Sequence, residues 1–472
     1  MAYSITTPTR VDRIWKEIVP PRGLLECFII IQFLWGVLLF IPGAQSFRPY
    51  IRALPYVSSL ALFAFYYGAR KHFRPTGLTK LVGLALLLLV LNLAHPQTQF
   101  LAGLAQCVFQ FSIAAPVFWA GKAIRNPRFL NRILWLIFVL CAANSLVGLL
   151  QIYFPQYLMP PEFSALAQSM DKNFMESLSY QGSRGQTIIR PPGLSDMPGG
   201  AAVAGMMAGV MGIVFSMRRE WQRWTRLLCL AASGIGMVTL YLTQVRSFFI
   251  MMVAAIAALC VVVVKRGKRW EGAWIALASA SLIVISFTWA LTIGGESISD
   301  RFIGIAETGL VNSIQANRGI FIEDTFNNLL FEYPLGAGLG RWGMMNVYFG
   351  DPNAPDYKPL WVEIQLTGWL LDGGILMWLF YGGAIVAALL YCYRQAVAAA
   401  DREMTYAARM TLCLSLIIAG TSFAGPCFNT QLGIQFWFLT AALNGAGAGL
   451  SRASRARLSR QREGMLAPAS SV

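Results

Sequence analysis

Charged residues are scarce in this sequence of 472 residues. Asp, Glu, Lys and Arg make up only 13% of it and hydrophobic residues 56%, whereas a water-soluble chain is about one quarter charged. This composition excludes a soluble globular protein. Histidine is limited to His72 and His95, and the eight cysteines lie singly in or beside apolar runs without CxxC spacing. A His-rich metal site, a zinc site and a disulfide framework are therefore not expected.

Long apolar runs are what the sequence has instead. A bilayer core of about 30 Å takes about 20 helical residues, and cutting the runs at charges and Pro/Gly turns leaves twelve candidate spans. They cover 24–41, 54–68, 78–94, 100–120, 131–153, 198–216, 225–243, 247–264, 273–292, 360–391, 407–426 and 430–450. The predicted fold is an all-α polytopic membrane protein with about twelve transmembrane helices. Its transmembrane domain covers 24–450, between a cytosolic segment, 1–23, and a basic tail, 451–472, which we expect to be disordered.

The net charge of +16 is explained by the orientation of the chain across the membrane. With the N-terminus inside, most basic residues fall in the connections that twelve spans place in the cytosol, as the positive-inside rule requires. We therefore expect both termini to be cytoplasmic and the excess charge to need no nucleic acid. The first run is long for a signal peptide and no clear cleavage site follows it, so we expect it to be retained.

Two long connections, 154–197 and 293–359, both fall outside. A major facilitator transporter would show two six-span halves joined by a long central cytosolic loop, but the central connection, 217–224, is short. Long loops on one face usually carry function. This asymmetry indicates binding or chemistry at the outer membrane face.

The first outer loop ends in a stretch rich in proline and glycine, from Arg190 to Gly200. Pro191 and Pro192 restrict the backbone and Gly193 permits a turn, so the stretch is a stiff strut that holds Arg190, or simply a lead-in to the next span. Ser195 or Asp196 is expected to cap that span's helix. Further along, Gly205 and Gly209 allow close helix packing.

Arg246 lies in the turn between two spans. Cytosolic basic residues precede the first span and follow the second, so the turn between them falls at the outer rim. An arginine there opposes the positive-inside bias and needs a partner. Two roles are therefore open for Arg246: it binds an anion, or it anchors the helix end by extending its charged group to the membrane interface.

In the second outer loop, apolar residues recur at helical spacing from Arg318 to Tyr333, which predicts an amphipathic helix over 316–333 at the outer surface. Pro334 ends it, and a glycine-rich run follows. Residues 338–343 satisfy GxGxxG, but no strand precedes them, so we reject a nucleotide site. The remaining possibility is a turn in which Arg341 and main-chain N–H groups face an anion.

The tenth span carries two acidic residues. Glu363 falls at the outer interface, where a carboxylate near several arginines can stay ionised and act as a general base. Asp372 lies within the span, before Gly373 and Gly374. A functional role is the default there, and a buried ion-pair partner or a local helix adjustment is the alternative.

The order of these features resembles the O-antigen ligase and polymerase superfamily of membrane glycosyltransferases. Arg190–Pro198 is similar to that family's Arg-x-x-Gly-Leu stretch, and Thr243–Ser247 to its Thr-x-Ser-Arg turn, with Val245 in place of Ser. The third likeness runs from Arg318 through Pro334–Gly340 and on to the acidic-x-Gly element at Asp372. The resemblance covers about 190–380 and implies a GT-C-like fold.

The resemblance implies an enzyme of the bacterial inner membrane that acts on undecaprenyl-diphosphate-linked glycans without metal or cofactor. Ligases of the family usually carry a His-Asn pair about nine residues before the acidic-x-Gly element, where this chain has Glu363-Ile364. That departure favours a polymerase of a surface polysaccharide or exopolysaccharide over a ligase that transfers glycan to lipid A core. A flippase and a chain-length regulator are the protein partners that it implies.

In this hypothesis the catalytic residues are Arg246, Arg318 and Glu363. Arg190, Arg341 and Asp372 bind substrate. Arginine suits a diphosphate because its planar fork matches phosphate oxygens and stays charged. The rival readings are a transporter of bicarbonate or another small anion that uses the same arginines, and a non-catalytic scaffold of an export complex.

Overall fold

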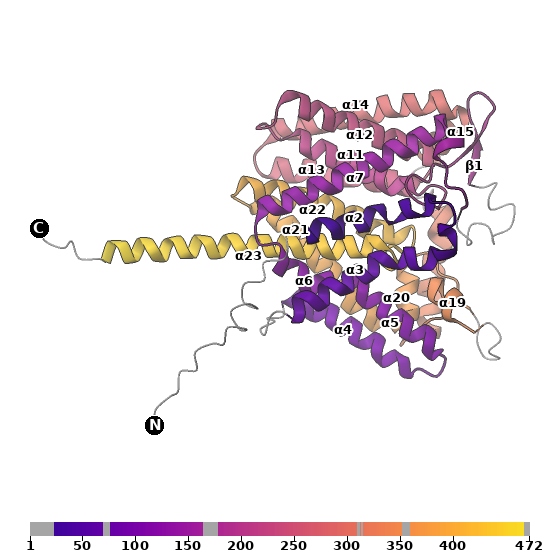
Figure 1. The fold of residues 1–472 in the computed structure, drawn as a ribbon, viewed down its shortest axis with the longest axis horizontal. Coiled ribbons are helices and arrows are strands. Elements are labelled where there is room, and N and C mark those ends of the chain that lie inside the picture. The colour runs from indigo at the N-terminus through magenta and orange to yellow at the C-terminus, as the bar shows by residue number, and fades with distance from the viewer. Residues whose placement is uncertain are drawn as a thin grey trace, which may run out of the picture.

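The computed structural model describes residues 23–68, 76–163, 178–308, 312, 315–351 and 359–466. Helices make up almost all of it (Figure 1). The first group is α2 (Leu24–Leu34), η1 (Trp35–Phe40), η2 (Ala44–Phe47), α3 (Arg48–Gly68), α4 (Gly77–Leu91), η3 (Asn92–Ala94), α5 (Phe100–Ala114), α6 (Pro116–Ala123), α7 (Pro127–Tyr153) and α8 (Pro155–Leu158). The second is α11 (Ala201–Ser216), α12 (Arg223–Thr243), α13 (Arg246–Lys265), α14 (Arg269–Gly294) and α15 (Glu296–Thr308). The third is α20 (Gln365–Met377), η6 (Trp378–Gly382), α21 (Gly383–Ala398), α22 (Arg402–Gly420), η7 (Thr421–Phe423), η8 (Cys427–Asn429) and α23 (Gln431–Leu466).

The length and composition of these helices suit a membrane. Within the described ranges, eight helices are long and apolar enough to cross a bilayer, and two shorter apolar helices accompany them. Helices are the expected solution, because they satisfy backbone groups internally where water is absent. A multi-pass helical membrane protein is therefore confirmed. Each of the twelve predicted spans overlaps a helix, but twelve crossings stay a prediction.

The centre of the bundle is built on close backbone approach. Nearly every residue of α11 is buried. A methyl group on Gly205 would lie 2.5 Å from the carbonyl oxygen of Gly236 in α12, and one on Gly212 would lie 2.4 Å from that of Cys229. Only glycine allows these contacts, so the structural interpretation of Gly205 is confirmed.

The connections between helices gather at two ends of the bundle. At one end, Arg218 after α11 pairs with Glu403 of α22 at 3.0 Å, and the Arg266 guanidinium donates to the carbonyl of Ala399 at 2.7 Å. At the other end, the Ser183 hydroxyl donates to the carbonyl of Thr292 at 2.8 Å. The sequence assigns the first set to the cytosol and the second to the outside. The grouping agrees with that alternation, and the cytosolic side stays a prediction.

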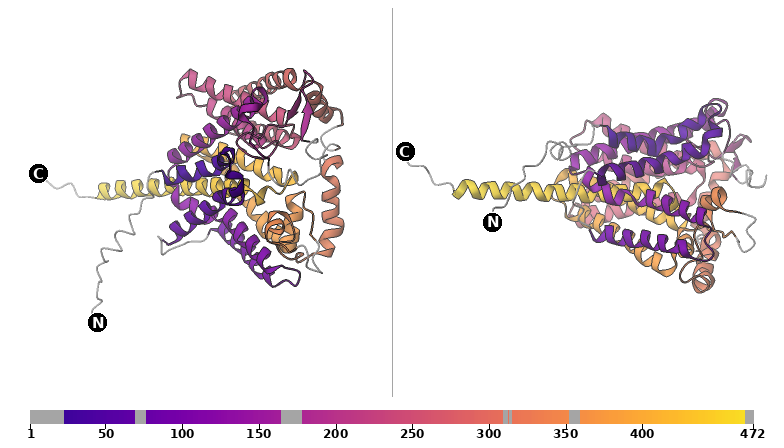
Figure 2. Two further views of the ribbon diagram at one scale, coloured as in Figure 1. Left: turned by 45° about the vertical axis from the view of Figure 1, so that its right-hand side comes forward. Right: turned by 60° about the horizontal axis from the view of Figure 1, so that its bottom comes forward.

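The outer end carries the irregular structure of the two long loops. It contains a hairpin of β1 (Ser179–Gln181) and β2 (Thr187–Ile189), which sequence reasoning missed, and the short helix α19 (Gly343–Phe349). The helix predicted over 316–333 is confirmed as a continuous helical run of η4 (Gln315–Gly319), α17 (Ile320–Asp324), η5 (Thr325–Leu329) and α18 (Leu330–Glu332), and its amphipathic character stays a prediction. Figures 1 and 2 place β1, α15 and α19 opposite the projecting end of α23.

The basic tail corrects one expectation. Helix α23 continues through Leu466 and projects beyond the bundle (Figure 1), so the prediction of disorder from 451 is wrong up to that residue. Arg is the commonest residue of this stretch, which also contains Ala, Leu, Gln, Glu and Met, and all of these are strong helix formers. Adding residues to an existing helix also avoids the cost of nucleation. Residues 467–472 lie outside the described part, as does the predicted N-terminal segment apart from its last residue.

The tenth predicted span is a broken helix. Gly374 has φ 65° and ψ −157°, so the helical path is interrupted after Asp372. The glycine-rich run after Pro334 pairs with the freed backbone groups: the Ala337 amide donates to the carbonyl of Leu371 at 2.8 Å, and the Ile375 amide donates to the carbonyl of Pro334 at 3.0 Å. Irregular backbone at membrane depth requires such partners. The run therefore completes the broken helix.

We expect Gly374→Ala to destabilise the fold strongly. The added methyl group would lie 2.1 Å from the carbonyl oxygen of Pro334, and a backbone region reserved for glycine costs about 1–3 kcal/mol in other residues. The thermal midpoint of the purified protein in detergent should fall. Gly382→Ala is the matched control, because no atom lies within 4 Å of its added methyl group. Equal midpoints for the two variants would contradict the prediction.

Candidate functional site

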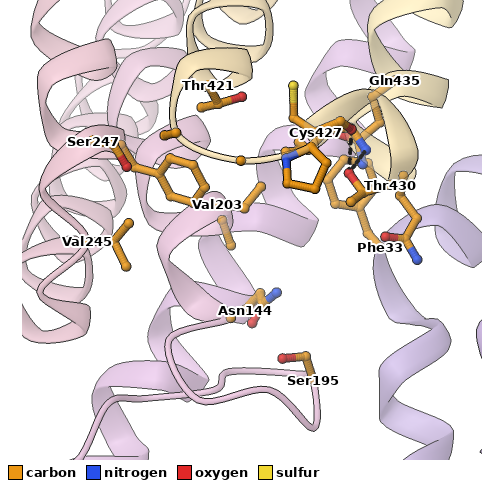
Figure 3. Close-up of a pocket in the computed structure, with 18 of the residues that line it drawn as sticks. Phe33, Asn144, Ser195, Val203, Val245, Ser247, Thr421, Cys427, Thr430 and Gln435 are labelled. Carbon is orange, nitrogen blue, oxygen red and sulfur yellow. Dashed lines mark hydrogen bonds between the residues drawn. The ribbon is translucent and has the colours of Figure 1, made fainter. Parts of the chain in front are cut away.

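A cavity of about 460 Å³ lies between α2, α7, α11, α13 and the turn from α22 to α23, within the about 300–1,000 Å³ typical of ligand sites. Figure 3 shows Val245 and Ser247 on one side of it, Phe33 on the opposite side and Ser195 below. Its polar lining includes Gln32, Asn144, Ser195, Ser247, Arg318, Thr421, Thr430, Gln431 and Gln435. Ser195 and Arg318 come from the two long outer loops, so the loops that the sequence singled out meet at this cavity.

The strut from Arg190 to Gly200 forms one wall and is held by polar contacts. The Gly193 amide donates to the Gln151 side chain at 2.8 Å, and the Leu194 amide donates to that of Asn144 at 2.8 Å. Gly193 has φ 62°, and a methyl group there would lie 2.2 Å from Oδ1 of Asn144. The stiffness expected from the prolines is therefore reinforced by α7.

The expected helix cap is not found. Gly200 occupies the cap position of α11 without a side-chain hydrogen bond. The Ser195 hydroxyl donates to the carbonyl of Pro192 at 2.9 Å, and Asp196 accepts two hydrogen bonds from Arg52 of α3, both at 2.9 Å. Capping by Ser195 or Asp196 is wrong. The buried Asp196 carboxylate binds both Arg52 and Arg48, and these charge-assisted contacts are stronger than a contact with a helix end.

Three arginines lie together beside the strut. The Nε atoms of Arg190, Arg246 and Arg301 are buried and have no hydrogen-bond partner, and no acidic residue in the described ranges forms an ion pair with them. Burial, and then the charges of Arg190 and Arg246, lower the pKa of Arg301 to about 10. Arg301 therefore remains charged near neutral pH, and the group concentrates positive charge for which the described ranges supply no acidic partner.

Helix α15 brings Arg301 to this group. The rings of Tyr241 and Phe302 meet edge to face with centroids 4.9 Å apart, and the Gln244 side chain donates to the carbonyl of Ser297 at 3.4 Å. Arg190 is placed by the strut, since its carbonyl accepts from the Gly199 amide at 3.0 Å. Sequence reasoning missed Arg301, although its place on the outer side, against the positive-inside bias, was a usable signal.

Arg318 and Glu363, predicted separately, form an ion pair through Nη1 and Oε2. The other carboxylate oxygen accepts a hydrogen bond from the Trp361 indole at 3.0 Å. Arg318 lines the cavity, whereas Glu363 is not among the lining residues. The arrangement couples a cavity-facing guanidinium to a fixed carboxylate.

Arg341 and Asp372 lie apart from the cavity lining. The Arg341 side chain is buried and donates to the Gln97 side chain and to the carbonyl of Ala337. The Asp372 carboxylate accepts from Gln106 at 3.0 Å and from the Trp342 indole at 2.9 Å. Several amides of the glycine-rich run are also bonded within the protein. These contacts favour a structural role for both residues.

A histidine does lie at the outer end, although it is distant from Asp372 in sequence. His95 follows the helix η3 and accepts a hydrogen bond from the Gln97 amide at 3.2 Å. Partial burial and the nearby Arg341 charge lower its pKa, so it is neutral at pH 7. His95 does not line the cavity.

No family model matches the chain, and no curated protein matches it significantly. Within the described ranges, no group of three or more His, Cys, Asp or Glu side chains could hold a metal ion. The site consists of three arginines without an acidic partner in the described ranges, a cavity, and an ion pair of which Arg318 lines that cavity.

Proposed function

We propose that this protein is a polymerase that joins undecaprenyl-diphosphate-linked oligosaccharide repeats at the outer face of the bacterial inner membrane. The observation that carries the proposal is the group of Arg190, Arg246 and Arg301, which has no acidic partner in the described ranges. Such a group suits an anion with more than one charge, and arginine forks match the geometry of phosphate oxygens. A diphosphate on a membrane-embedded lipid satisfies both conditions.

In the proposed step, a hydroxyl oxygen of the acceptor glycan attacks the anomeric carbon of the donor glycan. The bond from that carbon to the diphosphate oxygen breaks, and undecaprenyl diphosphate leaves with the bonding electrons. Negative charge grows on the leaving diphosphate, where the three arginines stabilise it. Glu363 takes the proton of the attacking hydroxyl, and its ion pair with Arg318, which lines the cavity, holds that carboxylate next to it.

The outer cavity also fits this use better than it fits a permeation path. Next to it, sharing Gln32, Phe33 and Gln435, lies a void of about 10 Å³ surrounded mainly by apolar side chains such as Phe28, Met207 and Phe438. In the described part of the chain, a hydrated anion leaving the cavity through this void would meet apolar side chains. This geometry supports chemistry at one face over passage of an anion.

The test uses the purified protein in proteoliposomes with synthetic undecaprenyl-diphosphate-linked repeats. A ladder of longer glycans on a gel is the expected result. Transfer of glycan only to added lipid A core would identify a ligase instead. Uptake of labelled bicarbonate without any glycan product would favour the transporter and overturn the proposal.

Deleting the gene in its host gives the cellular counterpart. Loss of long surface chains with single repeats retained is expected, because attachment would continue without polymerisation. An unchanged ladder would contradict the proposal.

A further inference from the structure

A second hollow lies on the outside of the bundle. It has a volume of about 710 Å³ and runs between α3 and α5, with α19 across its outer end. Tyr56, Val57, Leu104, Val108 and Phe349 are among its apolar lining residues. Exposed apolar residues are ordinary on a membrane-facing helix, but a concave surface closed at one end by a separate short helix is not explained by lipid contact alone.

The outer end of this groove carries charge. Arg52 lines it, and Arg52 and Arg48 share the single carboxylate of Asp196, at 2.9 Å and 3.0 Å. Two guanidiniums on one carboxylate leave one positive charge uncompensated in the described part of the chain. Nε of Arg48 faces Asp196, and its Nη2 donates to the carbonyl of Phe163 at 3.1 Å, whereas Nε of Arg52 is buried without a hydrogen-bond partner. A groove that is apolar along its length and cationic at its outer end matches a lipid with an anionic headgroup.

The groove and the cavity share a wall. Leu194 and Ser195 line the cavity, while the next residue, Asp196, binds the arginine that lines the groove. A few residues of the strut therefore separate the cavity from the groove. A glycan attached to a headgroup at Arg52 has a short path over this strut into the cavity.

We propose that the groove between α3 and α5 binds the polyprenyl chain of the acceptor, with the acceptor's diphosphate at Arg48 and Arg52. This inference rests on the proposed polymerase function, in which two lipid-linked molecules meet. The acceptor keeps its diphosphate intact through the reaction, so a partly neutralised pair of arginines is enough to hold it. The donor's diphosphate gains charge as it leaves, and Arg190, Arg246 and Arg301 stabilise that charge.

The test measures binding of undecaprenyl diphosphate by native mass spectrometry, with phosphatidylglycerol as the competing lipid. The wild-type protein should bind two molecules of the diphosphate lipid, and phosphatidylglycerol should displace neither. Ala105→Trp, which fills the groove, should bind one. The matched control is Leu87→Trp on α4, where a tryptophan replaces an exposed apolar residue outside the groove, and it should bind two.

Catalysis supplies the second readout. In Ala105→Trp the KM for the acceptor repeat should rise by about tenfold, as expected when a few methylene groups lose their apolar contact. The KM for the donor should stay unchanged. Two bound lipids and an unchanged acceptor KM in this variant would overturn the groove assignment while the polymerase stands. So would equal displacement by phosphatidylglycerol, which would mean ordinary membrane lipid.

The failure of the proposed function looks different. It would be the absence of polymer from the wild-type protein, whatever lipids bind. In that case two bound diphosphate lipids, reduced to one by Ala105→Trp, would still locate a polyprenyl diphosphate site in the groove, and the acceptor role assigned to it would be overturned.

Discussion

Replacing Arg246 with alanine should lower the rate of polymer formation by about a hundredfold to a thousandfold, the usual cost of removing one preorganised donor from a site of developing charge. The rate is measured with purified protein and lipid-linked repeats at saturating concentrations. Arg246→Lys should recover only part of the loss, because an ammonium keeps the charge but lacks the planar fork.

The stability of the same variant separates function from structure. Burial, and then the charges of Arg190 and Arg246, lower the pKa of Arg301, so these two charges repel that of Arg301. Removing one charge should therefore leave the thermal midpoint unchanged or raise it. A structural arginine would behave in the opposite way, since its removal lowers the midpoint together with the rate.

Arg301→Ala should behave like Arg246→Ala in both measurements, because the two side chains belong to the same charged group. Arg184→Ala is the matched control, because this arginine is exposed and lies at the outer end, in the turn between β1 and β2. Its rate should equal that of the wild type. Full activity in Arg246→Ala would remove the cluster from the mechanism.

The local parts of this architecture could be predicted from the sequence. Apolar runs of span length located the helices, and the recurrence of apolar residues between Arg318 and Tyr333 predicted the outer amphipathic helix. Both depend on rules that act within one or two helical turns. The same rules placed Arg190, Arg246, Arg318 and Glu363 at the outer face.

The long-range contacts could not be predicted in this way. Asp196 was expected to cap a helix because its partner Arg52 is 144 positions away. Arg301 joins the cluster only because α15 folds back onto the turn after α12, through the contact of Phe302 with Tyr241. No spacing within either segment encodes that approach. The groove could not be predicted for the same reason, since α3 and α5, which form its two long sides, and α19, which crosses its outer end, are separate stretches of the chain.

The second large effect is expected at Glu363. If this carboxylate accepts the proton of the attacking hydroxyl, Glu363→Gln should lower kcat by about a hundredfold to ten-thousandfold, the range attributed to general base catalysis. The amide keeps the size of the side chain and an oxygen to accept the Trp361 hydrogen bond, but it cannot take up the proton. The wild-type pH–rate profile should lose its decline toward acidic pH in this variant.

The alternative is that Glu363 only positions Arg318, and the profile distinguishes the two roles. A positioning residue would alter KM and leave the shape of the profile unchanged, and Glu363→Asp would then restore most of the activity. The pair also allows a double-mutant cycle. Arg318 and Glu363 contact each other, so Arg318→Ala combined with Glu363→Ala should lose little more activity than the worse single variant. Losses that add independently would mean that each residue contributes to the reaction without the other, and the ion pair would then have no part in placing the base.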